Sequence, residues 1–321
     1  MMWETKITTM LGITFPIIQG GLAYLAYADL AAAVSNAGGL GQITAMSLQT
    51  PGELKREIKS VREKTKKPFG VNFAIGQHGR PYEEMLDVAI EEKVPVVSVT
   101  GGNPESFFQR LQGTEIKKLV LVSSSRQALK AEELGADAVM VVGYEGGGHL
   151  GRTDTSTMVL VPQVVDAVTI PVLASGGITD GRSMMAALAL GAEGIEMGTR
   201  FIATKECIHA HSRYKQMIID ASEEDTVVIK KSIGAPARAL KMHLTNKILA
   251  LEAESPTYNI LKQYISAEAN KAFIYDGNEE DGFGWAGQAI GRINDIPSVQ
   301  ELFERIMDES DLIRERLVNF T

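Results

Sequence analysis

Eight short apolar runs recur in the first two hundred residues, and their spacing is the feature that most limits the fold. Each run is about four to six residues long, is apolar on both faces, and is followed by Gly, Ser, Thr or Asn. This pattern is typical of parallel strands that are covered on both sides. The runs begin near Pro16, Leu40, Phe69, Val94, Lys118, Ala138, Pro171 and Gly194.

Helix signals lie between these runs. Thr50 is followed by Pro51 and, three residues on, by Glu53, which is a capping-box pattern with proline at the first helical position. The order strand-then-helix, repeated eight times, predicts a (β/α)8 barrel, the TIM-barrel fold, over residues 1–209. The alternative is a doubly wound open sheet, which usually has fewer strands.

The rest of the chain has a different pattern. Residues 213–222, 238–254 and 257–267 have a helical period with charged faces, and no strand-like run of the earlier kind follows them. We therefore expect residues 210–285 to form a helical lid, or substrate subdomain, over the barrel mouth. Ser298 and Glu301 form a second capping box, so residues 286–321 are expected to carry a final helix that packs back on the barrel.

Charge and composition exclude several classes of protein. The 32 basic and 40 acidic residues give a net charge of −8, which disfavours binding to a phosphate backbone. No apolar run approaches the ~18 residues of a membrane span, and the first residues do not resemble a signal peptide. A single cysteine, Cys207, cannot form an internal disulfide. We expect a cytoplasmic protein with a small-molecule ligand and neither a nucleic-acid nor a membrane partner; a homodimer is compatible with the sequence.

Glycine-rich segments end the seventh and eighth runs. Ser175, Gly176 and Gly177 follow one run, and Gly198 and Thr199 follow the next. In this fold the active site lies at the carboxyl ends of the strands, and the last two loops are the usual phosphate site. Glycine lets backbone N–H groups approach a phosphate closely. These segments therefore predict phosphate binding, with ordinary tight turns as the alternative.

One histidine of the five is placed for chemistry. His149 follows three glycines at the end of the sixth run, so its ring is expected to face the cavity. A neutral imidazole is suited to removing a proton near pH 7, which indicates a catalytic or substrate-orienting role. Glu145, at the start of the same loop, either orients a neighbour or caps the loop, and we favour the structural role.

The other histidines give weaker signals. His78 lies in a polar loop after the third run and could line the mouth. Cys207, His209 and His211 do not match common zinc-ligand spacing, so no metal site is predicted.

Seven segments, in order along the barrel, carry a resemblance to a known family. They are 16–23 (PIIQGGLA), 32–41 (AAVSNAGGLG), 68–72 (PFGVN), 135–139 (GADAV), 145–151 (EGGGHLG), 171–181 (PVLASGGITDG) and 186–204 (AALALGAEGIEMGTRFIAT). The likeness continues at residues 237–254 and 285–291 (WAGQAIG). On these segments the chain resembles the nitronate monooxygenase (2-nitropropane dioxygenase-like) flavoproteins, a group that also contains enoyl-ACP reductase II and an NADH:quinone reductase branch.

The resemblance implies a barrel with a helical lid and non-covalently bound FMN at its mouth. Gly21 and Leu22 would meet the flavin ring through backbone groups, and Asn72 would form a hydrogen bond near the ring. His149 matches the histidine that the family uses to remove the α-proton of a nitroalkane. The phosphate would be held by Gly176, Gly177, Gly198 and Thr199, and the other cofactor-binding positions would be Ser123, Gly147, Gly148 and Ser175.

The segment after the first run departs from the typical family pattern. Nitronate monooxygenases carry Pro-Met-Ala there, whereas this chain has Gly20, Gly21 and Leu22, which is closer to the reductase branches. The leading hypothesis is oxidation of alkyl nitronates or nitroalkanes with O2. The alternatives are an NAD(P)H-dependent reductase of an enoyl thioester or a quinone and, more remotely, a flavin-free barrel isomerase or aldolase acting on a phosphorylated metabolite.

Overall fold

A closed barrel of parallel strands forms the larger part of the molecule, as the sequence predicts. The computed structural model describes residues 3–76, 81–254 and 257–320. The strands pair in the order β1-β9-β8-β6-β5-β4-β3-β2, and a parallel bridge between Ile18 and Leu40 joins the two ends. The strands are β1 (Ile17–Gln19), β2 (Gly41–Thr44), β3 (Phe69–Ala74), β4 (Val96–Thr100), β5 (Lys117–Val122), β6 (Ala138–Val142), β8 (Val172–Ser175) and β9 (Gly194–Met197).

The amino-terminal end of the barrel is closed by α1 (Lys6–Leu11). Thr5 caps this helix by accepting a hydrogen bond from the backbone N–H of Thr8. Ile7 and Leu11 are buried in a cluster with strand residues such as Ile18 and Met140, which alternate along the strands with residues of the larger outer core. The interior of the barrel is therefore packed at this end, and a ligand must enter from the other.

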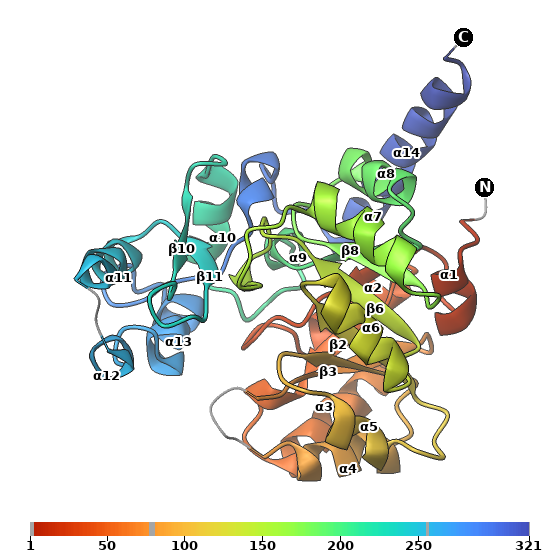
Figure 1. Cartoon of the computed structure of the whole chain (residues 1–321), viewed down its shortest axis with the longest axis horizontal. Coiled ribbons are helices and arrows are strands. Elements are labelled where there is room, and N and C mark those ends of the chain that lie inside the picture. Colours follow the sequence, from red (N-terminus) through yellow and green to blue (C-terminus); the bar gives the residue numbers. More distant parts are fainter. Residues whose placement is uncertain (1–2, 77–80, 255–256, 321) are drawn as a thin grey trace.

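Helices surround the barrel on its outer face (Figure 1). The last of them, α14 (Val299–Val318), packs against α8 and α2, and the Ser310 hydroxyl donates to the Gly181 carbonyl at 3.4 Å. Ser298 and Glu301 form the predicted capping box at its start. The other barrel helices are α2 (Ala28–Asn36), α3 (Pro51–Lys64), α4 (Glu83–Glu91), α5 (Glu105–Arg110), α6 (Ser125–Glu133), α7 (Thr157–Ala167), α8 (Gly181–Ala189) and the short α9 (Thr199–Ile202); η1 (Ala45–Ser47) follows β2.

The lid lies beside the carboxyl end of the barrel and is not purely helical. Helix α10 covers one predicted helical segment, but residues 226–240 contain two strands that the sequence analysis does not predict. These strands are four residues long and lack the continuous apolar runs of the barrel strands. The elements are α10 (Ser212–Asp220), β10 (Thr226–Ile229), β11 (Ala237–Leu240), α11 (His243–Ala253), α12 (Tyr258–Leu261), α13 (Ala267–Asp276) and η2 (Gln288–Arg292).

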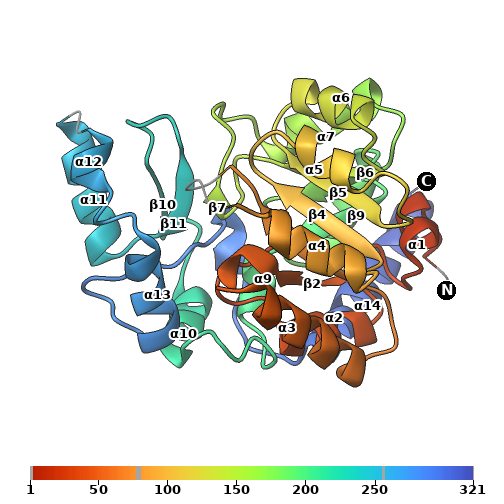
Figure 2. The ribbon, with the colours of Figure 1, turned by 90° about the horizontal axis from the view of Figure 1, so that it is seen from below.

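A small sheet joins the lid to the barrel. The loop after β6 contains β7 (Gly148–His149), which pairs antiparallel with β11, and β11 pairs antiparallel with β10. Figure 2 shows β7 at the junction between the two parts. His149 lies opposite Ala237 in this sheet, so the lid fixes the backbone of the candidate base.

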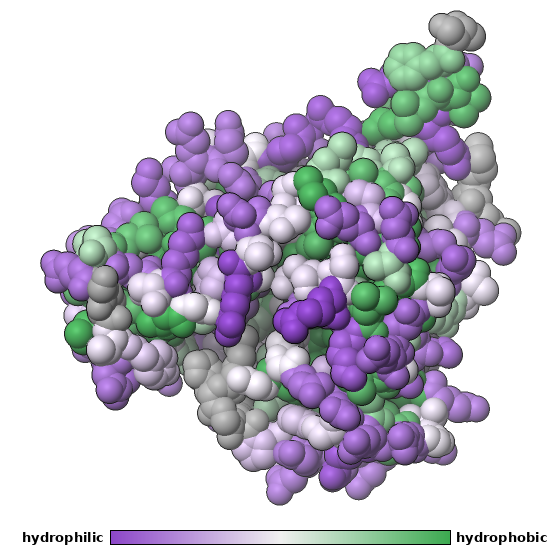
Figure 3. All heavy atoms as spheres, viewed as in Figure 1, coloured by the Kyte–Doolittle hydropathy of each residue, from purple (hydrophilic) through white to green (hydrophobic). Residues whose placement is uncertain are grey.

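The surface is mostly polar, and its exposed apolar side chains are concentrated in a few places. Figure 3 shows one such group at the projecting end of α14, where Leu312, Leu317 and Val318 are exposed. Within the described ranges, no helix is both long enough and apolar enough to cross a membrane.

The close packing of α2 on β2 makes one glycine essential for the fold. A Cβ atom on Gly41 would lie 1.9 Å from the backbone oxygen of Ala31. We expect Gly41→Ala to lower the free energy of unfolding by about 2–3 kcal/mol, because neither backbone segment can move aside easily. Gly52→Ala in α3 is the control, since its nearest neighbour would be 3.7 Å away. Urea unfolding of both variants tests this expectation, and equal stabilities would contradict it.

Candidate active site

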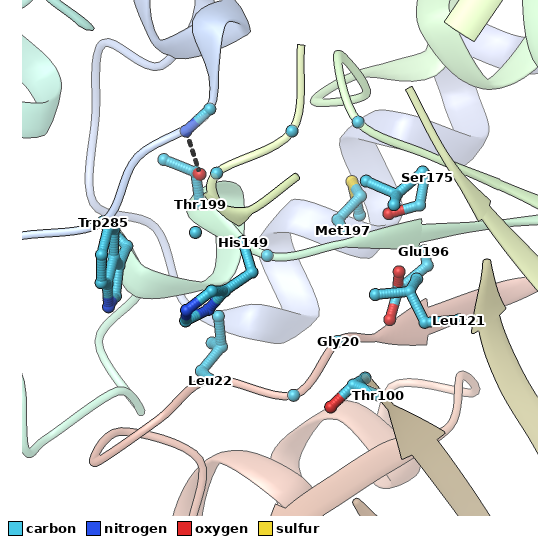
Figure 4. Close-up of a pocket in the computed structure, with 18 of the residues that line it drawn as sticks. Gly20, Leu22, Thr100, Leu121, His149, Ser175, Glu196, Met197, Thr199 and Trp285 are labelled. Atoms are coloured by element: carbon cyan, nitrogen blue, oxygen red, sulfur yellow. Dashed lines mark hydrogen bonds between the residues drawn. The ribbon is translucent and has the colours of Figure 1, made fainter. Parts of the chain in front are cut away.

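A cavity of about 370 Å³ opens at the carboxyl ends of the barrel strands, on the side that faces the lid (Figure 4). Every residue selected from the sequence as a site residue lines it. The set is His149 together with Gly21, Leu22, Asn72, Ser123, Gly147, Gly148, Ser175, Gly176, Gly177, Gly198 and Thr199. Six of the eight barrel strands, β1, β3, β5, β6, β8 and β9, deliver these residues from distant parts of the chain to one place.

The two glycine-rich loops leave space along one wall of the cavity. Gly176 and Gly177 have φ angles of +84° and +78°, in the left-handed region that favours glycine. A Cβ on Gly177 would have Glu145 as its nearest neighbour at 3.5 Å, and one on Gly198 would have Leu22 at 3.4 Å. This wall therefore offers backbone groups without side chains in front of them, which suits an oxyanion such as a phosphate.

Asn72 projects from β3 into the cavity between buried neighbours. Its side-chain amide donates a 2.9 Å hydrogen bond to the Ser98 hydroxyl, and the residue is only 2% exposed. A Cβ on Gly21 would lie 2.3 Å from the amide oxygen of Asn72. Gly21 is therefore required for Asn72 to hold this position. The neighbouring Leu22 is fixed by its backbone N–H, which donates to the Thr44 hydroxyl at 3.1 Å.

Ser123 lines the cavity at the end of β5, but its hydroxyl is engaged locally. It donates at 3.0 Å to the side-chain oxygen of Gln127, which also accepts from the Ser123 backbone N–H at 2.7 Å. Gln127 lines the same cavity and was not selected from the sequence. Its amide group adds a second hydrogen-bonding group at this wall.

His149 lies where the barrel and the lid meet. Gly148, with a φ of +73°, turns the chain into β7 and directs the imidazole towards the ring of Trp285, whose centroid is 5.7 Å away. The Nε2 atom of His149 is 2.9 Å from the Nζ atom of Lys230, which comes from the end of β10. The histidine therefore faces a cavity wall that is made partly of lid residues (Figure 4).

One returning segment, residues 284–288, links the lid to both barrel loops. The backbone N–H of Gly287 donates to the Thr199 hydroxyl at 2.9 Å, the hydrogen bond drawn in Figure 4. The next N–H, of Gln288, donates to the Glu145 carbonyl at 2.8 Å. The Tyr214 hydroxyl donates to the Trp285 carbonyl at 2.5 Å. This returning segment therefore holds together the lid, the candidate phosphate loop after β9 (residues 198–199) and the histidine loop after β6 (residues 145–149).

Glu145 has the structural role favoured from the sequence. Its carboxylate accepts from the backbone N–H of Thr157 at 2.9 Å and from the Thr157 hydroxyl at 3.0 Å. These contacts satisfy the amino-terminal end of α7, where helix N–H groups lack partners. The Arg238 guanidinium contributes to the same region by donating to the Tyr144 carbonyl at 3.0 Å.

The remaining histidines and the cysteine have local structural contacts. His211 accepts from the backbone N–H of Arg213 at 3.1 Å, and the His209 ring lies edge-on to Tyr27. Cys207 is fully buried, and burial raises its pKa to about 12, so its thiol is inert near neutral pH. Across the ranges that the structure describes, no group of three candidate metal ligands occurs. His78 lies outside those ranges.

A buried carboxyl group, Glu196, was missed by the sequence analysis. It lies on β9, is 5% exposed, and lines the cavity on the side away from His149 and Trp285 (Figure 4). Burial raises its pKa to about 7, although a hydrogen bond from Ser175 opposes the shift. A charged residue within an otherwise apolar strand was the available signal. Lys230 and Trp285 gave no such signal, because only the folded lid brings them to His149.

Comparison with known proteins decides the family. The family model described as nitronate monooxygenase matches residues 4–79 and 74–309. The chain belongs to this family.

The family's curated relatives and solved structures cover almost the whole chain. A probable nitronate monooxygenase of Staphylococcus saprophyticus is 33% identical over 98% of this chain and 100% of the relative. FabK from Thermotoga maritima is 40% identical, with a TM-score of 0.93 over 99% of each chain. Nitroalkane oxidase from Streptomyces ansochromogenes is 27% identical, with a TM-score of 0.81 over 97% of this chain and 99% of the other. The chain is therefore an oxidoreductase of a flavin-dependent family.

The buried carboxyl group of Glu196 makes the stability of the protein depend on pH. Its pKa rises from 4.5 to about 7 on folding, so the folded protein binds this proton more tightly than the unfolded chain does. The resulting stabilisation is complete below pH 4.5 and is lost as the pH rises through 7. We expect Glu196→Gln to increase the free energy of unfolding at pH 8 by up to ~3 kcal/mol, and to have little effect near pH 4.5.

Urea unfolding of the flavin-free protein at the two pH values measures this difference. Glu91→Gln, at an exposed position of α4, is the matched control. If Glu196→Gln and wild type differ by the same amount at both pH values, the carboxyl group does not titrate in this range.

Proposed function

We propose that this protein is an FMN-dependent oxidoreductase that oxidises alkyl nitronates or nitroalkanes with O2. The observation that carries the proposal is the position of His149, which the lid sheet holds at one wall of a glycine-lined cavity. An imidazole beside an enclosed cavity can take the α-proton of a neutral nitroalkane. The family model and the curated relatives agree with this activity.

The cavity walls fit the cofactor that the family implies. Gly177 and Gly198 leave a strip of unobstructed backbone that a phosphate would occupy, and Asn72 presents a buried amide that could meet the edge of a flavin ring. When bound, FMN would supply the electron acceptor for the oxidation. The residues proposed to hold it are Gly21, Leu22, Asn72, Ser123, Gly147, Gly148, Ser175, Gly176, Gly177, Gly198 and Thr199.

The chain's own side chains have separate tasks in this proposal. His149 takes a proton from the carbon next to the nitro group. Trp285 lies beside the imidazole and packs edge-on against Phe283, with ring centroids 4.8 Å apart, so it limits the access of water to this wall. Thr199 and Gly287 keep the returning segment against the phosphate-loop candidate.

A second candidate function is an NAD(P)H-dependent reductase of an enoyl thioester or a quinone. Two observations favour it: the loop Gly20–Leu22 departs from the pattern of nitronate monooxygenases, and the chain is 40% identical to FabK, which represents the enoyl-ACP reductase II branch. The family assignment argues against the flavin-free isomerase or aldolase.

An anaerobic visible spectrum separates the candidates. If the flavin absorbance persists with NADH and NADPH but bleaches with propyl-2-nitronate, the result supports oxidation of nitronates. A band that bleaches with a nicotinamide within seconds supports a reductase instead. Absence of a flavin band after incubation with FMN would contradict both.

The proposed phosphate site at Gly177 can be tested with two substitutions of equal size that differ only in charge. We expect Gly177→Asp to lower FMN occupancy, because a carboxylate would face the phosphate. Gly177→Asn is the matched control, since asparagine has the same size and tolerates the positive φ at this position. Occupancy is measured by flavin absorbance after dialysis. Riboflavin, which lacks the phosphate, should bind both variants equally; equal FMN occupancy in the two would place the phosphate elsewhere.

The base is tested by two forms of one substrate. We expect His149→Ala to keep FMN but to lose kcat/KM for neutral 2-nitropropane by about 10²–10⁴-fold, with a much smaller loss for the pre-formed nitronate. The nitronate has already lost its α-proton, so it does not need the base. His243→Ala, at an exposed position on α11, is the control. Equal losses on both forms would mean that His149 orients the substrate and is not a base.

A further inference from the structure

A lysine from the lid reaches the histidine of the cavity. Lys230 directly follows β10, and its Nζ atom is 2.9 Å from Nε2 of His149. The residue is only 9% exposed, which is unusual for lysine. The contact therefore joins a buried cation from one part of the molecule to the candidate base of the other.

The lid holds this lysine in a constrained conformation. Its φ angle is +68°, in the left-handed region that is rare for a residue other than glycine. One carboxylate, that of Glu252 on α11, accepts from the backbone N–H groups of Lys230 at 2.8 Å and Ser232 at 2.9 Å, and also from the Ser232 hydroxyl. The direction of the Cα–Cβ bond of Lys230 is thus fixed by its backbone, and it starts the side chain towards His149.

His149 is the titratable group that lies nearest to the ammonium group of Lys230. Among described residues, no carboxylate lies within 4.0 Å of its Nζ atom; Glu252 acts on it at longer range, and the Trp285 ring lies 5.8 Å away. Burial lowers the pKa of Lys230 to about 8, with Glu252 opposing the shift. Two cations 2.9 Å apart would repel strongly, so the lysine and His149 titrate as one unit.

We propose that Lys230 is a positioning residue for His149: in the resting site its ammonium group donates to Nε2, so that the imidazole stays neutral with its proton on Nδ1 and the pair carries one positive charge. This contact must open before Nε2 can take a proton from a substrate. The proposal uses the proposed function only in assigning His149 to the substrate. The lysine acts through the histidine and is not itself among the residues that line the cavity.

Nuclear magnetic resonance of ¹⁵N-histidine-labelled protein tests the proposal without turnover. The signal of His149 is assigned by its loss in His149→Gln. In wild type we expect Nε2 to be unprotonated and Nδ1 to be protonated at pH 7. In Lys230→Met the imidazole should bind a proton at a pH higher by about one unit or more, because the neighbouring positive charge has gone, and its tautomer preference should weaken.

Further variants separate charge, hydrogen bonding and packing. Lys230→Arg keeps a cation and should keep the wild-type titration. Lys230→Gln keeps a donor without the charge, so it should keep the tautomer but raise the pH of protonation; it also replaces Lys230→Met if that variant does not fold. Lys231→Met is the matched control, because the Lys231 side chain lies over Tyr144 instead. An unchanged titration and tautomer in both Lys230→Met and Lys230→Gln would overturn the proposal.

The pH profile of kcat/KM for 2-nitropropane gives the second measurement. In Lys230→Met the acidic limb of this profile, where kcat/KM falls as His149 becomes protonated, should move to higher pH. The KM for the pre-formed nitronate should change less than kcat/KM for 2-nitropropane does. If wild type does not oxidise nitroalkanes, the proposed function fails, but the NMR titration still decides the role of Lys230. If the NMR titration shifts and the limb does not, His149 is paired with Lys230 but is not the base.

Discussion

The pairing of β7 with β11 is the contact on which the arrangement of the candidate site depends. Two residues of a barrel loop, Gly148 and His149, form backbone hydrogen bonds with the lid strand that contains Ala237. A glycine-rich loop has many accessible conformations, and ordering it is costly in entropy. The sheet removes that freedom and fixes the backbone from which the imidazole projects. Without the lid strand, the barrel alone would not specify where His149 lies.

The eight barrel strands were predictable because each is a continuous apolar run bounded by turn residues. Burial on both faces makes such strands visible in one dimension, as at Val96–Thr100 and Ala138–Val142. The glycine loops were predictable for a related reason: the fold places the ends of successive strands side by side. The sequence also selected His149, since a histidine among glycines at a strand end has few structural uses, and the structure places this residue at the cavity.

The lid residues could not be placed in the same way. Strand β10, Thr226–Ile229, is half-buried, and β11 contains Arg238 and Ala residues that also suit helices. Lys230 and Trp285 are 55 residues apart in sequence and meet only when both strands and the returning segment are in place. Glu196 is a different case, because a charged residue between Ile195 and Met197 is visible in the sequence, whereas its raised pKa arises only from burial in the folded protein. For Lys230 and Trp285 the information lies in tertiary contacts and not in local pattern.

The returning segment at residues 284–288 has a thermodynamic consequence. It bonds to Thr199 on the phosphate-loop candidate and to Glu145 on the histidine loop, and Trp285 forms a bridge to Ala239 in the lid sheet. A ligand that binds the ordered form of one of these elements stabilises that form relative to its disordered alternatives. Stabilising any one of the phosphate loop, the histidine loop and the lid sheet therefore also stabilises the ordered form of the other two, because all three are bonded to residues 284–288. A substitution deep in the lid can thus weaken ligand binding at the barrel end without altering any atom that the ligand touches.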